Sequence, residues 1–164
     1  TIVPPILFLL VVCTLLNPAY FLEVKGPNDE VLLYVPVSIE DNFTLAYTHS
    51  IYKKDVYEVF RINRLCEIVL SEVISSEIVA QGTPYSGLSY TVANGYAHIK
   101  VGDVRFSDLV VRNVGNRTLT YGSSTIPLYK FAGYGDRFKI RAVHLCSLLI
   151  NSWRGEGLQW PNML

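Results

Sequence analysis

The sequence has few charges and no excess of either sign. Only 17% of its 164 residues are charged, and 14 lysines and arginines balance 14 aspartates and glutamates. A surface that binds nucleic acid needs clustered positive charge to neutralise phosphates, and the chain contains no basic run. We therefore expect no nucleic acid among its partners.

Cysteine is scarce as well. The three cysteines, Cys13, Cys66 and Cys146, form no C-x-x-C pair, so the sequence does not support a zinc ribbon or a covalent haem. In an oxidising compartment Cys66 and Cys146 would either pair or remain two buried thiols, and both readings stay open. We expect no cofactor and no structural metal.

One long hydrophobic run is present, near the N-terminus. Residues 6–16 are apolar and no charge occurs before residue 23. An uncharged stretch of about twenty residues is long enough to cross a bilayer as a helix. Asn17-Pro18 ends the run, and Tyr20 and Phe21 follow where an aromatic belt would lie. We predict that residues 1–21 form a membrane anchor. Packing within an assembly and a cleaved signal segment are the alternatives.

Beyond residue 22, short β-branched and aromatic segments alternate with Gly, Pro, Asn and Asp. This pattern predicts one all-β domain over residues 22–143, a β-sandwich or partly closed barrel of about 9–11 short antiparallel strands. Asn94-Gly95 is the clearest hairpin signal. Residues 144–164 form an apolar tail with Trp153 and Trp160, which we expect to pack on the domain, on lipid or on a neighbour.

The predicted strands are Leu22–Lys25, Val31–Val37, Phe43–His49, Val56–Asn63, Cys66–Ser75, Leu88–Val92, Ala97–Val101, Leu109–Val114, Leu119–Tyr121, Ile126–Phe131 and Arg137–Val143.

The stretch from Phe43 to Phe60 is the most distinctive part of the chain. A period of two places Tyr47 and His49 on one face of a strand. Hairpin pairing with the next strand would bring His49 near Glu58. A carboxylate on an otherwise apolar face is costly unless it is paired, so we expect Glu58 to have a partner. The candidates are His49, Ser50 and Tyr47.

This stretch could form a nucleophilic site, a metal site, a structural His–Glu pair or a ligand pocket. A nucleophilic site is disfavoured because Ser50 directly follows His49 and points to the opposite face of the strand. A metal site lacks a third strong ligand, since His98 and His144 come from unpatterned positions. A buried His–Glu pair that holds the hairpin remains, as does a pocket that uses the same pair to bind the polar end of a ligand. We expect no enzyme.

Two triplets match the N-glycosylation pattern. They are Asn42-Phe43-Thr44 and Asn116-Arg117-Thr118, and both lie at predicted strand starts or turns. They agree with an extracytoplasmic location for the domain.

The stretch Phe43–Phe60, with Gly82-x-Pro84 downstream, resembles the family called domain of unknown function 1850. Asn116–Leu119, Gly122 and Gly135–Phe138 resemble the terminal hairpin and closing strand of that family, so the resemblance covers roughly residues 10–141. Tyr52, Asp55 and Ala80 depart from its pattern. The residues that match its central motifs are Tyr47, Thr48, His49, Ser50, Glu58, Gly82 and Pro84.

The resemblance implies a non-catalytic protein associated with membrane components of TRAP-type solute transporters. We therefore expect a membrane-anchored accessory or binding protein on the extracytoplasmic side of the cell membrane, with a transporter permease as partner. The alternative is a structural subunit of an extracellular filament or pilus. In that case the apolar N-terminal segment would pack into neighbouring copies of the same chain in a cell-surface assembly.

Overall fold

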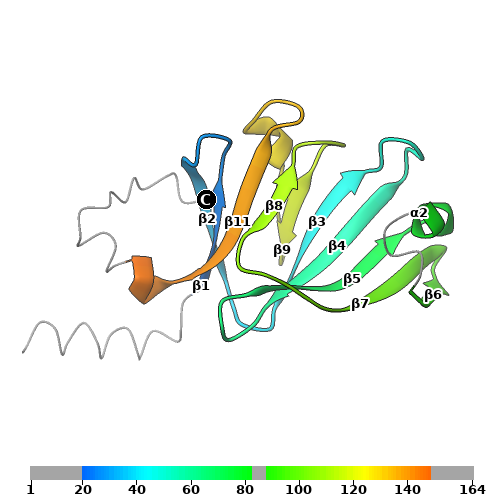
Figure 1. The fold of residues 1–164 in the computed structure, drawn as a ribbon, viewed down its shortest axis with the longest axis horizontal. Helices are drawn as coiled ribbons and strands as arrows, with labels where there is room; N and C mark the ends of the chain where they lie inside the picture. Colours follow the sequence, from blue (N-terminus) through cyan, green and yellow to red (C-terminus); the bar gives the residue numbers. More distant parts are fainter. Residues whose placement is uncertain (1–19, 83–87, 149–164) are drawn as a thin grey trace, which may run out of the picture.

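The computed structural model describes residues 20–82 and 88–148, apart from the side chain of Asp103. In this part of the chain two antiparallel sheets face each other without closing into a barrel (Figure 1). The prediction of an all-β sandwich is therefore confirmed. Three predicted features fall outside the described residues: the anchor up to residue 19, the family residue Pro84, and the tail from residue 149 onward.

The two sheets differ in size. The four-stranded sheet has the order β2 (Val31–Val37), β1 (Tyr20–Lys25), β11 (Arg137–His144) and β8 (Leu109–Arg112). The seven-stranded sheet has the order β10 (Ser124–Ile126), β9 (Thr118–Tyr121), β3 (Asn42–Thr48), β4 (Asp55–Ile62), β5 (Ile68–Ser75), β7 (Tyr96–Phe106) and β6 (Tyr90–Ala93). The described residues also form a short helix, α2 (Glu77–Gly82), a 3-10 helix, η1 (Leu128–Lys130), and a helical turn over residues 145–148.

The core lies between the sheets, because alternate residues of the paired strands point inward, except in β6, whose four residues are all exposed. The ring of Phe43 stacks on that of Phe60, with centroids 5.3 Å apart, at the centre of the larger sheet. Burial of this apolar surface is the main source of stability of such a sandwich. The inward residues that form the centre of the core are Leu22, Val24, Leu33, Val35, Phe43, Leu45, Phe60, Ile62, Leu109, Val111, Leu119, Phe138 and Ile140.

The structure agrees with one predicted turn and differs from one predicted strand. Asn94 and Gly95 both have positive φ, as a two-residue hairpin between β6 and β7 requires, so that hairpin is confirmed. The strand predicted over Ile126–Phe131 is wrong. Pro127 has no N–H to offer a strand ladder, so β10 ends at Ile126 and the chain continues as η1.

The strands give the sandwich two distinct ends. Tyr20 and His144 are register partners of β1 and β11, and their rings meet edge to face with centroids 5.0 Å apart. Both ends of the described chain therefore lie together, beside the turn Asn63–Glu67; we call this the terminal end. The opposite end, the loop end, includes the β1–β2 hairpin, residues 26–30, together with His49–Lys54, Asn113–Arg117 and Phe131–Asp136 (Figure 1).

The predicted apolar segment, residues 1–21, includes Tyr20 and Phe21, but the structure places both in the β domain. They begin β1, and Tyr20 is buried in the core. Among residues 20–82 and 88–148, no helix has the length and hydropathy needed to span a membrane.

Candidate functional site

A buried polar cluster lies at the loop end, on the inner face of the seven-stranded sheet. Register places Leu45 of β3 opposite Glu58 of β4 and also opposite Leu119 of β9. Arg117 directly precedes β9, so its side chain enters the same face one pair nearer the loop end, beside Tyr47. Three neighbouring strands thus bring a carboxylate, a phenol and a guanidinium together.

Arg117 holds this cluster together by two contacts. Its Nη1 donates to Oε2 of Glu58 at 3.2 Å, and its guanidinium carbon lies 4.3 Å from the centroid of the Tyr47 ring. The side chains of Arg117 and Glu58 are only 8% and 18% exposed. Tyr47 also hydrogen-bonds the Glu58 carboxylate. The cation is thus sandwiched between an aromatic face and a carboxylate, an arrangement that strengthens in low dielectric.

Burial dominates the electrostatics of Glu58. Loss of solvation raises the pKa of its carboxyl above the ordinary value, and the opposing effects of Arg117 and Tyr47 do not fully compensate. A buried ion pair of this kind is costly to form and still more costly to break. Arg117 Nε is buried and has no hydrogen-bond partner among the described residues. The cluster is therefore a largely buried structural element of the loop end.

His49 has a different role from the one we predicted. It lies beyond the end of β3, and its Nδ1 accepts the backbone N–H groups of Ile51 and Tyr52 at 3.3 and 3.4 Å. Its ring packs 5.1 Å from that of Tyr52. No hydrogen bond or ion pair between described residues joins His49 to Glu58. The expected His–Glu pair is replaced by a histidine that organises the β3–β4 loop and a glutamate held by Arg117.

Two backbone hydrogen bonds hold the end of strand β3 in place. Thr48 N–H donates to Gly115 O at 2.7 Å, and His49 N–H donates to Lys54 O at 2.8 Å, which closes the loop. Gly115 has a φ of +66°, and a Cβ there would lie 2.1 Å from Thr48 O. Only glycine permits this approach of the two chain segments.

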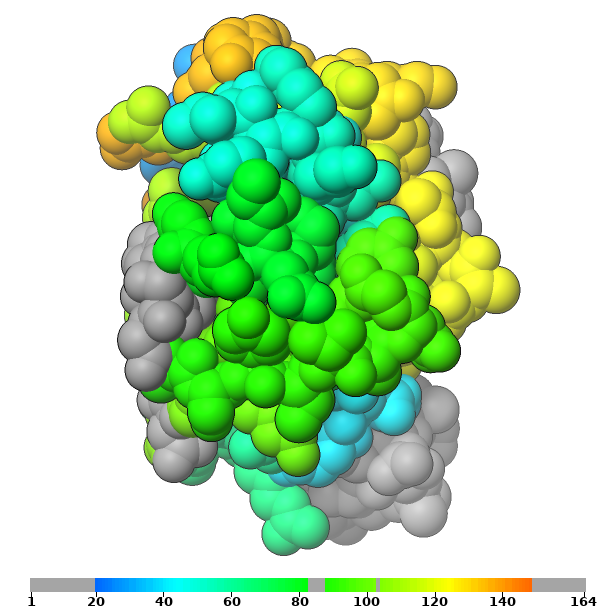
Figure 2. Space-filling view, turned by 90° about the vertical axis from the view of Figure 1, so that its right-hand side faces the viewer, coloured from blue at the N-terminus to red at the C-terminus, as the bar shows by residue number. Residues whose placement is uncertain are grey.

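Gly82 acts as a contact point between α2 and the β3–β4 loop. A Cβ at Gly82 would lie 2.6 Å from the hydroxyl oxygen of Tyr52. Figure 2 shows this loop in cyan lying directly above the green surface of α2 and its neighbouring strands. Tyr52, one of the departures from the family pattern, therefore packs against one of its matching glycines. Pro84 lies outside the described residues.

The remaining candidate residues, Ser50 and His98, lie outside the buried cluster. Ser50 is exposed at the loop and contacts neither His49 nor Glu58 through a hydrogen bond. Within the described ranges, no three His, Cys, Asp or Glu side chains gather as ligands for a metal ion. His98 contacts Glu72 instead, with Nδ1 and Oε1 3.0 Å apart.

The two glycosylation acceptors are both accessible. Asn42 is exposed at the first position of β3, and Asn116 is exposed in the turn before β9 with a φ of +54°. Exposure is what a glycan acceptor requires, so either site is available if the domain is exported.

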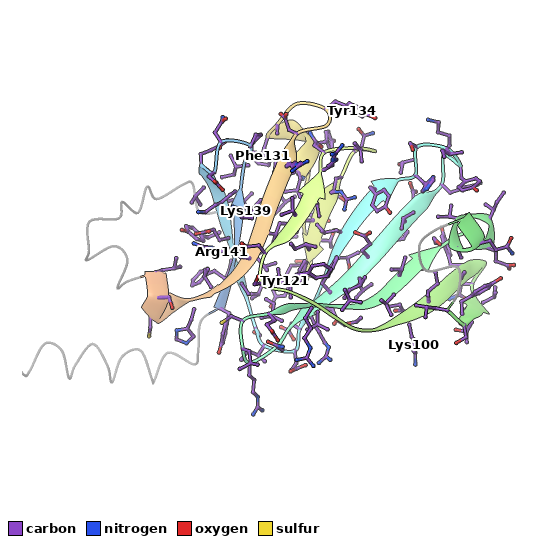
Figure 3. All side chains as sticks on the ribbon, in the orientation of Figure 1. Lys100, Tyr121, Phe131, Tyr134, Lys139 and Arg141 are labelled. Carbon is purple, nitrogen blue, oxygen red and sulfur yellow. The ribbon has the colours of Figure 1, made fainter. Side chains whose placement is uncertain are left out.

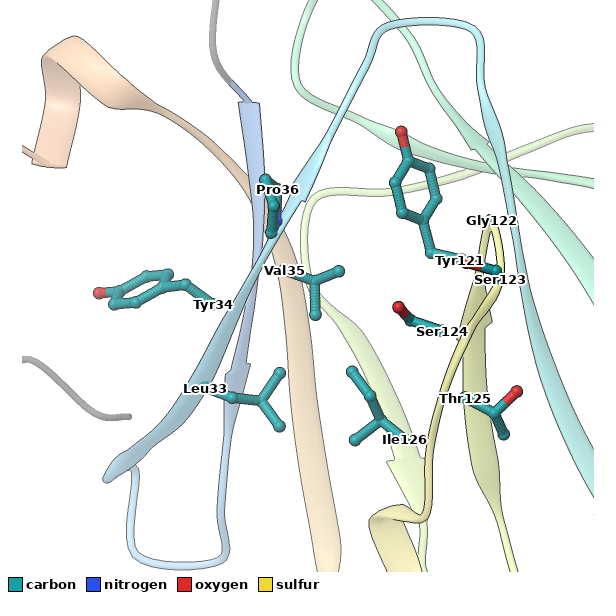
Figure 4. Close-up of a pocket in the computed structure, with 10 residues that line it drawn as sticks. All are labelled: Leu33, Tyr34, Val35, Pro36, Tyr121, Gly122, Ser123, Ser124, Thr125 and Ile126. Carbon is teal, nitrogen blue, oxygen red and sulfur yellow. The ribbon is translucent and has the colours of Figure 1, made fainter. Parts of the chain in front are cut away.

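A groove opens on one side of the sandwich, where the edge strands β2 and β10 face each other. Its volume is about 520 Å³. Figure 4 shows Leu33 and Val35 directed from β2 toward Ile126 of β10, so the floor of the groove is the core itself. Among the described residues, none that lines the groove is charged. The lining residues are Leu33, Tyr34, Val35, Pro36, Tyr121, Gly122, Ser123, Ser124, Thr125 and Ile126.

Sequence reasoning missed Arg117 as the partner of Glu58. A signal was present, since counting back by two from Leu119 places Arg117 on the inward face of its strand. A second charge facing the core is the natural partner for the first. The glycosylation triplet and the resemblance of Asn116–Leu119 to the family hairpin both include Arg117, but neither identifies it as an inward-facing charge.

These features define a class of protein: an antiparallel β-sandwich domain whose loop end is fixed by a buried Tyr–Arg–Glu cluster. The family model described as Domain of unknown function (DUF1850) matches residues 43–128, more than half of the chain. The chain belongs to this family. No curated protein and no solved structure matches the chain. The match runs from β3 to η1 and includes Tyr47, His49, Glu58 and Arg117.

Proposed function

We propose that the chain is a non-catalytic binding domain held at the extracytoplasmic face of a membrane by its N-terminal apolar segment. It would serve there as an accessory protein of a solute transporter, with a TRAP-type permease as partner. One observation carries the proposal: Tyr20 and His144 are register partners, so the chain enters and leaves the sandwich at one end. That end is suited to attachment, and the loop end is left free for binding.

The buried cluster supports a binding role and not a chemical one. Arg117 and Glu58 neutralise each other beneath the surface, and His49 uses its ring nitrogen to hold its own loop. These contacts make the loop end rigid. A rigid surface loses little conformational entropy when a partner docks, which favours affinity.

The test of attachment uses the three native cysteines. Replacing Cys66 and Cys146 by alanine leaves Cys13 as the single thiol. We expect a water-soluble maleimide to leave Cys13 unlabelled in intact membranes and to label it after detergent extraction, and we expect the permease to copurify in mild detergent. Labelling of Cys13 in intact membranes, or a chain released from membranes by salt alone, would show that the segment is no anchor.

A second candidate function is that of a subunit in an extracellular assembly, and the groove between β2 and β10 favours it. Its described lining carries no charge and is apolar at the floor, and β2 and β10 are the edge strands of their sheets among the described residues. Residues 6–16 of a second copy have matching chemistry, and an extended segment would add a strand there. Pro36 on β2 lacks an N–H, so pairing would use the edge of β10.

A disulfide trap separates the two candidates. In the same cysteine background, Ser123→Cys places a thiol on the rim of the groove, and Ser107→Cys places one on an exposed turn elsewhere as the matched control. An assembly predicts a Cys13–Cys bond between copies at position 123 and not at 107. The anchored domain predicts no such bond at either position.

A further inference from the structure

Three exposed aromatic side chains project from η1 and from the segment that joins it to β11. Tyr129, Phe131 and Tyr134 are 39%, 42% and 84% exposed. Figure 3 shows Phe131 and Tyr134 at the loop end of the molecule. Large aromatic side chains concentrate binding energy in protein interfaces, and three of them on one short segment are unusual for a surface that meets only water.

The segment that carries these rings is held rigidly. Asn113 is buried, and its side-chain nitrogen donates to Ala132 O at 2.7 Å and to Gly133 O at 3.0 Å. The backbone N–H of Gly135 donates to Asn113 O at 2.9 Å, and the Asp136 carboxylate accepts from Gly133 N–H at 2.7 Å. The aromatic side chains therefore stand on a preorganised backbone, as the anchors of a binding loop do.

Unpaired positive charge lies beside the aromatic segment. Arg112 of β8 and Arg137 of β11 are register partners, and both side chains are exposed. Within residues 20–82 and 88–148 neither has a carboxylate partner, and the exposed Lys130 is also without one. Like charges directly opposite each other on a sheet are destabilising. Asp136, the acid of this segment, already accepts the Gly133 N–H group.

We propose that Arg112, Arg137 and the rings of Phe131 and Tyr134 form a docking surface for an acidic segment of a partner protein. Charge complementarity carries the choice of partner, because a chain of zero net charge places two like-charged arginines side by side here. Carboxylates would satisfy the arginine fork bidentately while aliphatic carbons cover the rings. The inference rests on the proposed function, in which the loop end faces away from the anchoring membrane and toward the extracytoplasmic part of the transporter.

The experiment is site-specific photo-crosslinking with the full chain in its own membranes. A benzophenone amino acid replaces Tyr134, and the crosslinked peptide is identified by mass spectrometry. We expect a partner segment with net negative charge. Arg112→Gln/Arg137→Gln should reduce the crosslinking yield about tenfold, the effect of losing one or two charge-assisted contacts. Lys53→Gln/Lys54→Gln removes the same charge from another exposed loop of the loop end and should leave the yield unchanged.

Several results would overturn the docking surface. These are crosslinks to lipid, to a second copy of the chain or to an uncharged segment, an equal loss in the lysine variant, and no crosslink at all. Membrane fractionation of the same samples separates the two proposals. A chain absent from the membrane fraction contradicts the anchor, whereas a membrane-held chain without an acidic crosslink contradicts only the docking surface.

Discussion

At the scale of single residues, Arg117 neutralises Glu58 and covers the face of Tyr47. We predict that Arg117→Met lowers the free energy of unfolding by about 3–5 kcal/mol, because it leaves a buried carboxylate without its cation. The double variant Arg117→Met/Glu58→Met should recover most of that loss, since it removes both charges together. Urea unfolding of the detergent-solubilised chain measures both. A single variant as stable as the wild type would show that the pair is solvated.

The pKa of Glu58 leads to a pH prediction. Its folded-state pKa is raised by burial above the ordinary value of 4.5, so the folded chain binds this proton more tightly than the unfolded chain does. The resulting stability is present below pH 4.5 and is lost as the pH rises through the folded pKa. Glu58→Gln has no titrating group at this position. The stability of the wild type relative to Glu58→Gln should therefore fall as the pH rises from 4.5 through the folded-state pKa of Glu58. If the stability of the wild type relative to Glu58→Gln instead grew with pH, the pKa of Glu58 would be lowered on folding and not raised.

How far the sequence predicts the site depends on the type of contact. The cost of a carboxylate on an apolar face predicts that Glu58 has a partner, and the structure supplies Tyr47 and Arg117. Tyr47 was among our candidates, whereas His49 and Ser50 make no such contact. Pairing across three strands brings Arg117 to Glu58 over 59 residues of sequence. Strand periodicity identifies the inward face but does not specify which distant residue lies on the next strand.

At the scale of elements, the turn at Gly115 positions β9 against β3. We predict that Gly115→Ala lowers the free energy of unfolding by about 2–4 kcal/mol, through the left-handed backbone and the clash with Thr48 O. Gly122→Ala is the matched control. Its φ of +56° is similar, but nothing lies within 4 Å of the added carbon, so it should cost only about 1–2 kcal/mol. Equal losses in urea unfolding would show that Gly115 tolerates the contact by moving.

Element predictions succeeded where local chemistry decides and failed where a single residue overrides the pattern. Asn94-Gly95 specifies its hairpin through two positive φ angles. Pro127 ends β10 within a run that otherwise has strand composition. The same limit applies to the end of β3, where Gly115 O accepts the N–H of Thr48. That contact joins a strand end to a distant turn and has no signal within either segment.

At the scale of the whole molecule, the family match covers fewer residues than the sandwich does. Residues 43–128 include every strand of the seven-stranded sheet and β8. The other three strands of the smaller sheet, β1, β2 and β11, come from the two flanks of that match. These flanks pair with each other along β1 and β11. The sandwich therefore closes only when sequences from both sides of the matched region meet, which links its stability to the end from which the chain emerges.

The terminal end of the sandwich should lie closer to the membrane surface than the loop end does. Strand β11 has eight residues and separates them by about 26 Å. We predict that a fluorophore on Leu65→Cys, in the turn beside Tyr20, is quenched several-fold more strongly by spin-labelled lipid headgroups than one on Tyr134→Cys, in a background free of other cysteines. Both sites are exposed, so access to the label is matched. Stronger quenching at position 134 would place the aromatic segment on the bilayer and remove the partner-facing role of the loop end. Equal quenching at the two sites would mean that the sandwich lies flat, with the open edges of β2 and β10 and the loop end equally near the lipid.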